Sequence, residues 1–405
     1  GFSAKYGQAL AGLISVSTRD GGDRWRGRLA YETDRPMSGG ADLGLDRFVV
    51  QGDGPLAGKV TALAILDLSG RLDAEPVNAP AATDARDPRK DTPGPLPHNS
   101  GEVLTAGGKL TIPMSTRITT RLFGLGTREQ RYLFDQRYKY EPTLGPGRRV
   151  DGKLLSAHVQ LAPTEGSNRP FSGDVRVGYF SKDFVRGTVD APDFKFGAFT
   201  GSKLGGLGEE VARQQDAIGT RARMAGFGTP GYSLNTPYGV PGFFLGGATQ
   251  GDVAWNRFTE LRGQLDFTAT LGDNTDIGFG GLHAAQDVKT FQRVLANLPV
   301  GGAVPPATAS AFSPTISAAY LESQVRASDI AITAGIRYDA FSPGGDLSNS
   351  TLAARSSFNP RIAIATTLKG ATFVASVGRF SQPPDLQYLV DAAFDDTTRT
   401  GRFRQ

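Results

Sequence analysis

Hydrophobic and polar residues alternate along most of this chain with the two-residue period of a β-strand. The clearest case is Phe358–Pro384, which holds two such runs joined by Lys369–Gly370. In the first run, Ile362 and Ile364 share one face, while Arg361 and its alternate neighbours share the other. Two alternating runs around a tight polar turn predict an antiparallel hairpin.

Two other segments show that the second face of the strands carries charges. One sets Leu261, Leu265, Phe267, Ala269 and Leu271 against Glu260, Arg262, Gln264, Asp266, Thr268 and Thr270. The other sets Ile330, Ile332, Ala334, Ile336 and Tyr338 against Thr333, Gly335, Arg337 and Asp339. A soluble sandwich places such charges outward, whereas a membrane barrel places them inward, toward a wet lumen. The alternation alone leaves both arrangements open.

The same pattern along the chain predicts roughly thirteen strands of about 9 to 14 residues, the length that crosses a bilayer when tilted. After strand-like runs at Leu13–Thr18 and Arg28–Glu32, the predicted strands lie near Leu43–Gln51, Lys59–Leu68, Val103–Ile112, Ser115–Leu125, Lys153–Leu161, Phe171–Phe180, Trp255–Thr270, Thr275–His283, Phe312–Gln324, Ser328–Ala340 and the hairpin above.

The links between these strands are sorted by length. Every second link is short, at Asp53–Gly58, Pro113–Met114, Pro163–Pro170, Gly272–Asn274, Arg326–Ala327 and Lys369–Gly370. The intervening links are long, at Gly70–Gly101, Glu129–Gly152, Ser181–Ala254, Ala284–Ala311 and Phe341–Ser357, and only Asp34–Ala41 is brief. Because successive strands alternate in direction, all short links fall at one end of the sheet. Bacterial outer-membrane barrels have this asymmetry, with short periplasmic turns and longer extracellular loops.

Composition agrees with a transmembrane barrel and excludes other classes. Only 39% of the 405 residues are hydrophobic and 53 are glycine, as a polar lumen allows. No run of about 18 apolar residues exists, which excludes a helical membrane span. The absence of cysteine excludes disulfides and thiol chemistry. A net charge of +4 on scattered basic residues argues against nucleic-acid binding.

Two stretches resemble a known family. Lys5–Gly22, KYGQALAGLISVSTRDGG, resembles the segment that closes the plug domain of TonB-dependent outer-membrane receptors. Phe358–Leu389, FNPRIAIATTLKGATFVASVGRFSQPPDLQYL, resembles mid-barrel strands of the same family, and is most similar to the branch with an N-terminal carboxypeptidase-regulatory-like domain. The resemblance implies residence in the outer membrane of a Gram-negative bacterium, in contact with its lipid.

The resemblance also implies a domain arrangement. Residues 1–22 are expected to be the C-terminal end of the plug domain. Residues 23–405 are expected to form part of an all-β, antiparallel barrel, with about 13 of the 22 strands that the family has, and long extracellular loops at 70–101, 129–152, 181–254, 284–311 and 341–357. The TonB-contacting box and the aromatic-ended last strand of the family are absent from this sequence, so we expect a longer parent protein that contacts a TonB-type energising complex through a region missing here.

Three other features are candidate chemical sites. Gly147–Leu154 is one residue short of a phosphate-binding loop, since Leu154 replaces the required hydroxyl and a strand follows, so we interpret it as an ordinary loop. His98, His158 and His283 lack metal-ligand spacing, and His158 is expected to face the lumen. The mixed charges of Asp84–Asp91 indicate a solvated loop rather than a calcium site. The sequence therefore nominates no catalytic, cofactor-binding or metal-binding residue, and no cofactor.

One link is the candidate for ligand contact. Ser181–Ala254 is about seventy residues long, a length that is uncommon unless the loop is functional or disordered. In a barrel it would lie outside the cell and cap or contact a ligand, although an ordinary surface loop is an equal alternative. Its individual ligand-binding residues are not assigned.

These features predict a non-enzymatic receptor and transporter that takes up a bulky, scarce nutrient by a TonB-type mechanism. Two alternatives stay open. A passive, plug-free porin would share the strands, and a secreted β-rich adhesin or surface-layer protein would bury the apolar faces between sheets.

Overall fold

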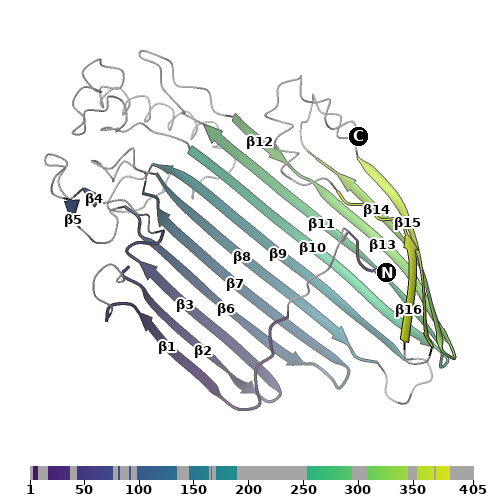
Figure 1. The fold of residues 1–405 in the computed structure, drawn as a ribbon. Coiled ribbons are helices and arrows are strands. Elements are labelled where there is room, and N and C mark those ends of the chain that lie inside the picture. The colour runs from purple at the N-terminus through teal and green to yellow at the C-terminus, as the bar shows by residue number, and fades with distance from the viewer. Residues whose placement is uncertain are drawn as a thin grey trace.

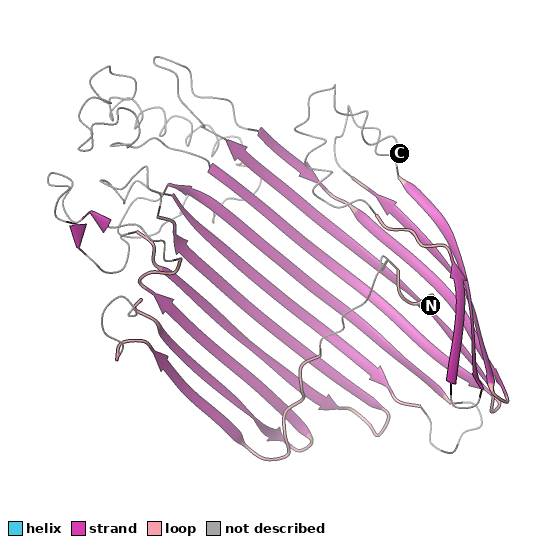
Figure 2. Cartoon of the chain, viewed as in Figure 1, coloured by secondary structure: helices cyan, strands magenta, loops and turns pink. Residues whose placement is uncertain are grey.

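One large antiparallel sheet dominates the computed structural model of the chain (Figure 1). The structure describes residues 3–7, 17–36, 43–75, 81–82, 91–92, 98–134, 146–163, 166, 170–188, 253–293, 308–344, 354–368 and 371–383. The regular elements drawn in Figure 2 are all strands. No helix in these residues is both long and apolar enough to cross a membrane.

The sheet has 14 strands, and the order of the strands across the sheet follows their order in the sequence. They are β1 (Arg26–Thr33), β2 (Asp46–Ala57), β3 (Val60–Arg71), β6 (Gly101–Pro113), β7 (Ile118–Tyr132), β8 (Pro146–Leu161), β9 (Phe171–Thr188), β10 (Val253–Leu271), β11 (Thr275–Arg293), β12 (Thr308–Phe312), β13 (Thr315–Ala327), β14 (Ile330–Ser342), β15 (Arg355–Leu368) and β16 (Ala371–Gly378). A separate two-stranded sheet pairs β4 (Ala81–Ala82) with β5 (Asp91–Thr92).

β12 and β13 continue each other along the same partner strand. Val288 of β11 pairs with Phe312 and Ala285 pairs with Thr315, so the register passes unchanged across the break between them. Pro314 lies in that break, where it has no N–H to give to the ladder. The described sheet therefore consists of thirteen consecutive strand paths, which confirms the predicted number of strands.

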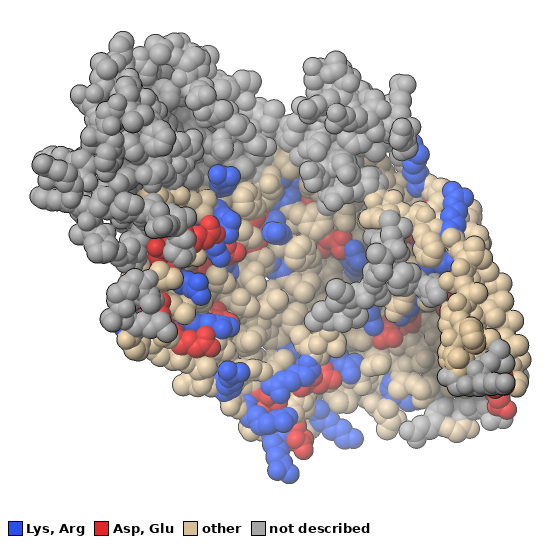
Figure 3. Space-filling view, viewed as in Figure 1, with Lys and Arg blue, Asp and Glu red and all other residues tan. Residues whose placement is uncertain are grey.

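The two faces of the sheet have opposite character, because apolar and polar residues alternate. On the outward face, large apolar side chains are exposed on every long strand. They include Leu29, Phe48, Leu68, Leu104, Leu122, Leu155, Val177, Leu261, Leu265, Phe279, Leu321, Ile332, Ile336, Ile364 and Phe373. On the inward face, Asp266 and Arg337 are only 4% exposed. The sheet curves toward this polar face, and Figure 3 shows acidic and basic side chains gathered over it. The inward placement of the charges, which the sequence left open, is thus settled.

The connections are sorted as predicted. Residues 58–59, 114–117, 162–170, 272–274, 328–329 and 369–370 link strands at one end of the sheet, and the longer links all lie at the other (Figure 1). Gly58 and Gly272 turn the chain with φ of 57° and 63°. Positive φ is accessible to glycine without steric cost. Ser328 also turns the chain with a positive φ, of 52°, in the two-residue link between β13 and β14.

Several predicted loop limits are wrong, because the strands are longer than the apolar pattern indicates. β7 ends at Tyr132 and β8 starts at Pro146, so the expected loop 129–152 shrinks to 133–145. The expected loops 70–101, 181–254, 284–311 and 341–357 become links over 72–100, 189–252, 294–307 and 343–354, the third leading into β12. Alternation marks only the part of a strand that meets an apolar environment, whereas backbone pairing continues past it into polar sequence.

The described strands form an open, partial barrel. β1 is hydrogen-bonded to β2 alone and β16 to β15 alone. The predicted all-β, antiparallel, partial barrel is therefore confirmed. The expected run at Leu13–Thr18 falls mostly outside the described residues, and Ser17 and Thr18 are not in a strand.

Candidate functional site: the N-terminal segment on the concave face

The described residues that precede β1, 3–7 and 17–25, lie against the concave, polar face of the sheet (Figure 1). The described parts of this N-terminal segment contact the sheet at two places. Residues 3–7 contact β10, β13, β14 and β15, and residues 17–22 contact β2, β6 and β7. We name these contacts the first anchor and the second anchor.

The first anchor holds the backbone of Ser3–Tyr6 with charged wall residues. Arg361 Nη1 donates to the carbonyl oxygens of Ser3 and Tyr6, both at 2.7 Å. Arg337 Nη1 donates to the carbonyls of Ala4 and Lys5 at 3.2 and 2.8 Å. Glu322 accepts from the Ser3 hydroxyl and from the Ala4 N–H. Charge-assisted hydrogen bonds of this kind are the stronger ones in proteins, so the backbone is firmly positioned.

Two glycines let the first anchor approach the wall closely. Ala4 is fully buried, and a Cβ placed on Gly335 would lie 2.9 Å from the Ala4 Cβ. A Cβ on Gly7 would lie 2.5 Å from the guanidinium of Arg337. Any larger residue at 7 or 335 would force the segment or the wall side chain to shift.

A buried carboxylate completes the first anchor. Lys5 Nζ lies 3.2 Å from an oxygen of Asp266, whose other oxygen accepts a hydrogen bond of 2.8 Å from Tyr320. Gln264 also donates to Asp266. The wall therefore supplies Lys5 with a carboxylate that is already positioned by two hydrogen bonds.

The second anchor is ionic and lies beside the start of the barrel. Asp20 pairs with Lys109 of β6 at 2.6 Å and with Arg121 of β7 at 3.1 Å. Asp53 of β2, which is 2% exposed, accepts from Arg19 at 2.6 Å and from the backbone N–H of Gly22 at 3.0 Å. Ion pairs and hydrogen bonds between the segment and the sheet thus connect residues 19–22 to three strands, β2, β6 and β7.

The electrostatics of the second anchor favour the ionised form of Asp20. Partial burial alone would raise the pKa of its carboxyl group. Hydrogen bonds from Lys109 and Arg121 outweigh that effect, so the pKa lies below its ordinary value of 3.8. The carboxyl group of Asp20 is therefore ionised at neutral pH.

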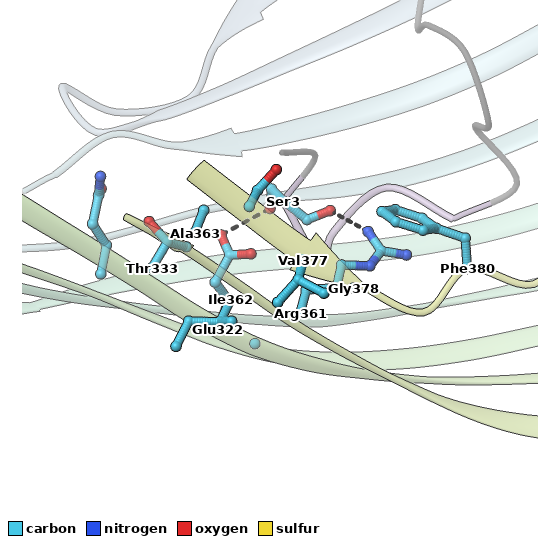
Figure 4. A pocket seen from close by; sticks show the side chains of 12 residues that line it. Ser3, Glu322, Thr333, Arg361, Ile362, Ala363, Val377, Gly378 and Phe380 are labelled. Atoms are coloured by element: carbon cyan, nitrogen blue, oxygen red, sulfur yellow. Dashed lines mark hydrogen bonds between the residues drawn. The ribbon is translucent and has the colours of Figure 1, made fainter. Parts of the chain in front are cut away.

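A pocket of about 520 Å³ opens beside the first anchor (Figure 4). Ser3 and Arg361 border it, and Figure 4 shows the Arg361 guanidinium between Ser3 and Phe380. The other lining residues are Glu322, Gln324, Thr333, Gly335, Ile362, Ala363, Ser376, Val377, Gly378 and Phe380. The pocket thus lies on the concave side, between the segment and β13–β16.

The features nominated from the sequence do not converge on a chemical site. The interpretation of Gly147–Leu154 as a loop is wrong, because this segment lies in β8 and pairs with β7 and β9. His158 is on the inward face as predicted, and its Nε2 lies 2.5 Å from Asp174. His283 hydrogen-bonds Ser317, and the ring of His98 packs on Tyr132. The three histidines lie on different strands and loops.

Two other nominated segments fall largely outside the described residues. These are the charge cluster Asp84–Asp91, of which only Asp91 is described, and residues 189–252 of the long link that was expected to contact ligand. In the part of the chain that is described, no three His, Asp or Glu side chains are grouped so as to hold a metal ion.

Sequence reasoning missed the residues that build the anchors. It placed Arg337 and Arg361 on the polar face, but it gave no sign that they bind Ser3–Tyr6. Their partners are 332 to 358 positions away in the chain, so no local pattern links them.

Comparisons with known proteins identify the fold. Neither a scan of protein-family models nor a search of curated proteins finds a match. Among solved structures, the FrpB iron transporter of Neisseria meningitidis (F5-1 variant) matches with a TM-score of 0.53 at 14% identity, over 91% of this chain and 49% of that chain. A mutant ferric enterobactin receptor of Pseudomonas aeruginosa, PfeA in complex with enterobactin, matches with a TM-score of 0.51 at 13% identity, over 93% and 47% of the two chains. This chain has the fold of the TonB-dependent outer-membrane receptors.

The fold and the outward face of the sheet together indicate that this face contacts lipid. This face exposes apolar side chains on every long strand, as a lipid-facing wall requires. Fold and surface together place the chain in the bacterial outer membrane, as predicted. The chain spans about half the length of the structures that it matches. The branch of the family that the sequence resembles stays a prediction.

Proposed function

We propose that the parent protein is a receptor that imports a bulky, scarce nutrient across the outer membrane with energy from a TonB-type complex. The matched proteins are named as an iron transporter and a ferric enterobactin receptor, so metal chelates are the first ligand class to test. The proposed role is transport without bond chemistry, and it involves no catalytic residue.

One observation carries this proposal. The N-terminal segment is tied across the concave face by ion pairs and carbonyl hydrogen bonds at two anchors. A passive porin conducts through a water-filled lumen, which a chain held on the concave face would obstruct. In this proposal residues 1–22 are the end of a plug domain, and residues 23–405 are wall and loops.

Electrical conductance distinguishes the proposed receptor from a passive porin. The complete protein, reconstituted in a planar lipid bilayer, is expected to show no steady open channel, because the anchored segment and the plug obstruct the lumen. A stable ohmic conductance in every inserted molecule would instead identify a passive porin. Extraction from cell envelopes without detergent would identify a secreted surface protein.

Energy dependence is tested in cells that produce the complete protein and lack their own iron receptors. Uptake of radioactive iron as catecholate or hydroxamate chelates is expected to saturate with concentration and to stop when a protonophore is added. Uptake that is linear with concentration and unaffected by the protonophore would rule out the TonB-type mechanism.

A further inference from the structure

Two segments that are far apart in the chain share the same two wall arginines. One is Ser3–Tyr6 of the first anchor, whose carbonyl oxygens accept hydrogen bonds from Arg337 and Arg361. The other is residues 379–383, which follow β16 at the end of the sheet that carries the long links (Figure 1). We name these five residues the post-β16 segment. Its side chains reach one arginine directly and the other through two residues of the wall.

Phe380 of the post-β16 segment contacts Arg361 directly. The centroid of its ring lies 4.4 Å from Cζ of Arg361, which is a cation–π contact. Figure 4 shows the guanidinium between Phe380 and Ser3. Because an arginine side chain has many rotamers, a contact that restricts them lowers the entropic cost of the next contact. Phe380 and the N-terminal segment therefore each favour a conformation of Arg361 that the other requires.

Ser381 reaches Arg337 through Asn359 and Asp339. Its hydroxyl accepts from the Asn359 amide at 2.8 Å and donates to Oδ2 of Asp339 at 3.3 Å. Asn359 is fully buried and donates to the same Asp339 oxygen at 2.8 Å. The other oxygen, Oδ1, accepts from Nε of Arg337 at 2.8 Å. Ser381 and Asn359 thus position the carboxylate that orients Arg337 toward the N-terminal segment.

We propose that the N-terminal segment and the post-β16 segment are coupled through Arg337 and Arg361, so that docking of either segment orders the other. Such coupling is reciprocal. Holding the post-β16 segment in place strengthens the first anchor, and displacing the first anchor loosens the post-β16 segment. In the receptor proposed above, it lets a ligand at the outer end of β16 change how firmly the N-terminal segment is held. That role rests on the proposed function, whereas the coupling itself does not.

The first test measures docking of the first anchor after a change in the post-β16 segment. The reporter is Ala4→Cys in the complete protein, with any native cysteine beyond residues 1–405 replaced by serine. Because Ala4 is fully buried, a water-soluble maleimide modifies this thiol only in the undocked fraction of molecules. Phe380→Leu and Ser381→Ala are each expected to raise the rate of modification at least fivefold.

Matched variants separate this coupling from a general loosening of the wall beside β16. Phe380→Tyr keeps an aromatic ring beside Arg361, so it is expected to keep the parent rate within twofold. Gln382→Ala changes an exposed side chain of the same segment and is also expected to keep that rate.

The second test runs in the opposite direction. A nitroxide spin label on Gln382→Cys reports the mobility of the post-β16 segment. Ala4→Leu displaces the first anchor, because Ala4 is packed against Gly335 without room for a larger side chain. The rotational correlation time of the label is then expected to fall at least twofold. A label on Asp329→Cys, in the exposed link between β13 and β14, is the control and is expected to stay unchanged, which shows an intact wall.

Each part of the proposal has a result that overturns it. An unchanged modification rate in Phe380→Leu would overturn the route through Arg361, and an unchanged rate in Ser381→Ala would overturn the route through Arg337. An equal rise in Gln382→Ala, or an unchanged label in Ala4→Leu, would overturn the coupling as a whole. Neither test measures transport, so the coupling can fail in a working receptor and can hold in a passive porin.

Discussion

Asp20 carries most of the ionic character of the second anchor. It joins the N-terminal segment to two strands through Lys109 and Arg121. Because these partners lower its pKa below 3.8, docking binds the carboxylate more tightly than the carboxylic acid. The contribution of Asp20 to docking is therefore complete above pH 3.8 and is lost as the pH falls through the lowered pKa.

The pH dependence of docking is observable through Trp25, which packs against Gly54 just after the anchor. In a Trp255→Phe background, Trp25 is the single tryptophan of residues 1–405. Its emission is expected to stay constant from neutral pH down to about pH 4 and to change below it. Asp20→Asn is expected to shift the emission already at neutral pH. Asp23→Asn, at an exposed neighbour, is the control and should keep the parent curve; an Asp20→Asn curve identical to the parent would refute this role.

At the scale of the strands, the two faces follow from alternation. Leu265 of β10 is 47% exposed on the outward face, whereas its neighbours Gln264 and Asp266 point into the lumen and hydrogen-bond each other. A charged side chain at position 265 would therefore face lipid, whereas one at position 264 would face the polar groups of the lumen.

Leu265→Arg is expected to destabilise the folded barrel by about 2–4 kcal/mol, the cost of arginine near the middle of a bilayer. Gln264→Arg is the matched control, because an arginine there retains Asp266 as a partner, and it is expected to change stability by less than about 1 kcal/mol. Guanidinium unfolding in lipid vesicles measures both. Equal stability of the two variants would contradict the assignment of the faces.

The sequence alone predicts these strands correctly, because apolar and polar side chains alternate along them. Prediction from the sequence fails where that alternation stops. The apolar–polar pattern predicted the positions of the strands, the sorted links and the inward direction of His158. It failed at Gly147–Leu154, because Arg148, Arg149, Asp151 and Lys153 put charges on both faces of a strand that continues past the apolar belt. Backbone pairing with β7 and β9 maintains the strand there, and pairing is a property of the neighbours rather than of the local sequence.

At the scale of the whole molecule, the N-terminal segment joins opposite parts of the sheet. Its first anchor contacts β10 and β13–β15, and its second contacts β2, β6 and β7. The sequence resemblance predicted a plug-like segment, but the contacts of the first anchor with β13–β15 join residues more than 300 positions apart. Only the folded sheet brings Arg337 and Arg361 to Ser3–Tyr6.

The contact between the N-terminal segment and the wall is tested most directly by a disulfide cross-link between the two. Residues 1–405 contain no cysteine, so Ala4→Cys with Gly335→Cys introduces one defined pair into this part of the complete protein. The Cβ separation of 2.9 Å is within about 1 Å of the roughly 3.8 Å that a disulfide requires. The control pair, Ala4→Cys with Gly263→Cys, has its second cysteine on the outward face of β10.

Oxidation of native outer membranes is expected to cross-link the Ala4–Gly335 pair in most molecules and to leave the control pair reduced. If the segment moves during transport, the cross-link is also expected to stop chelate uptake, and a reductant is expected to restore it. Failure of the Ala4–Gly335 pair to cross-link, with both thiols open to a water-soluble maleimide, would show that the segment does not lie on the concave face. Full uptake through the cross-linked protein would show that the first anchor has no part in transport.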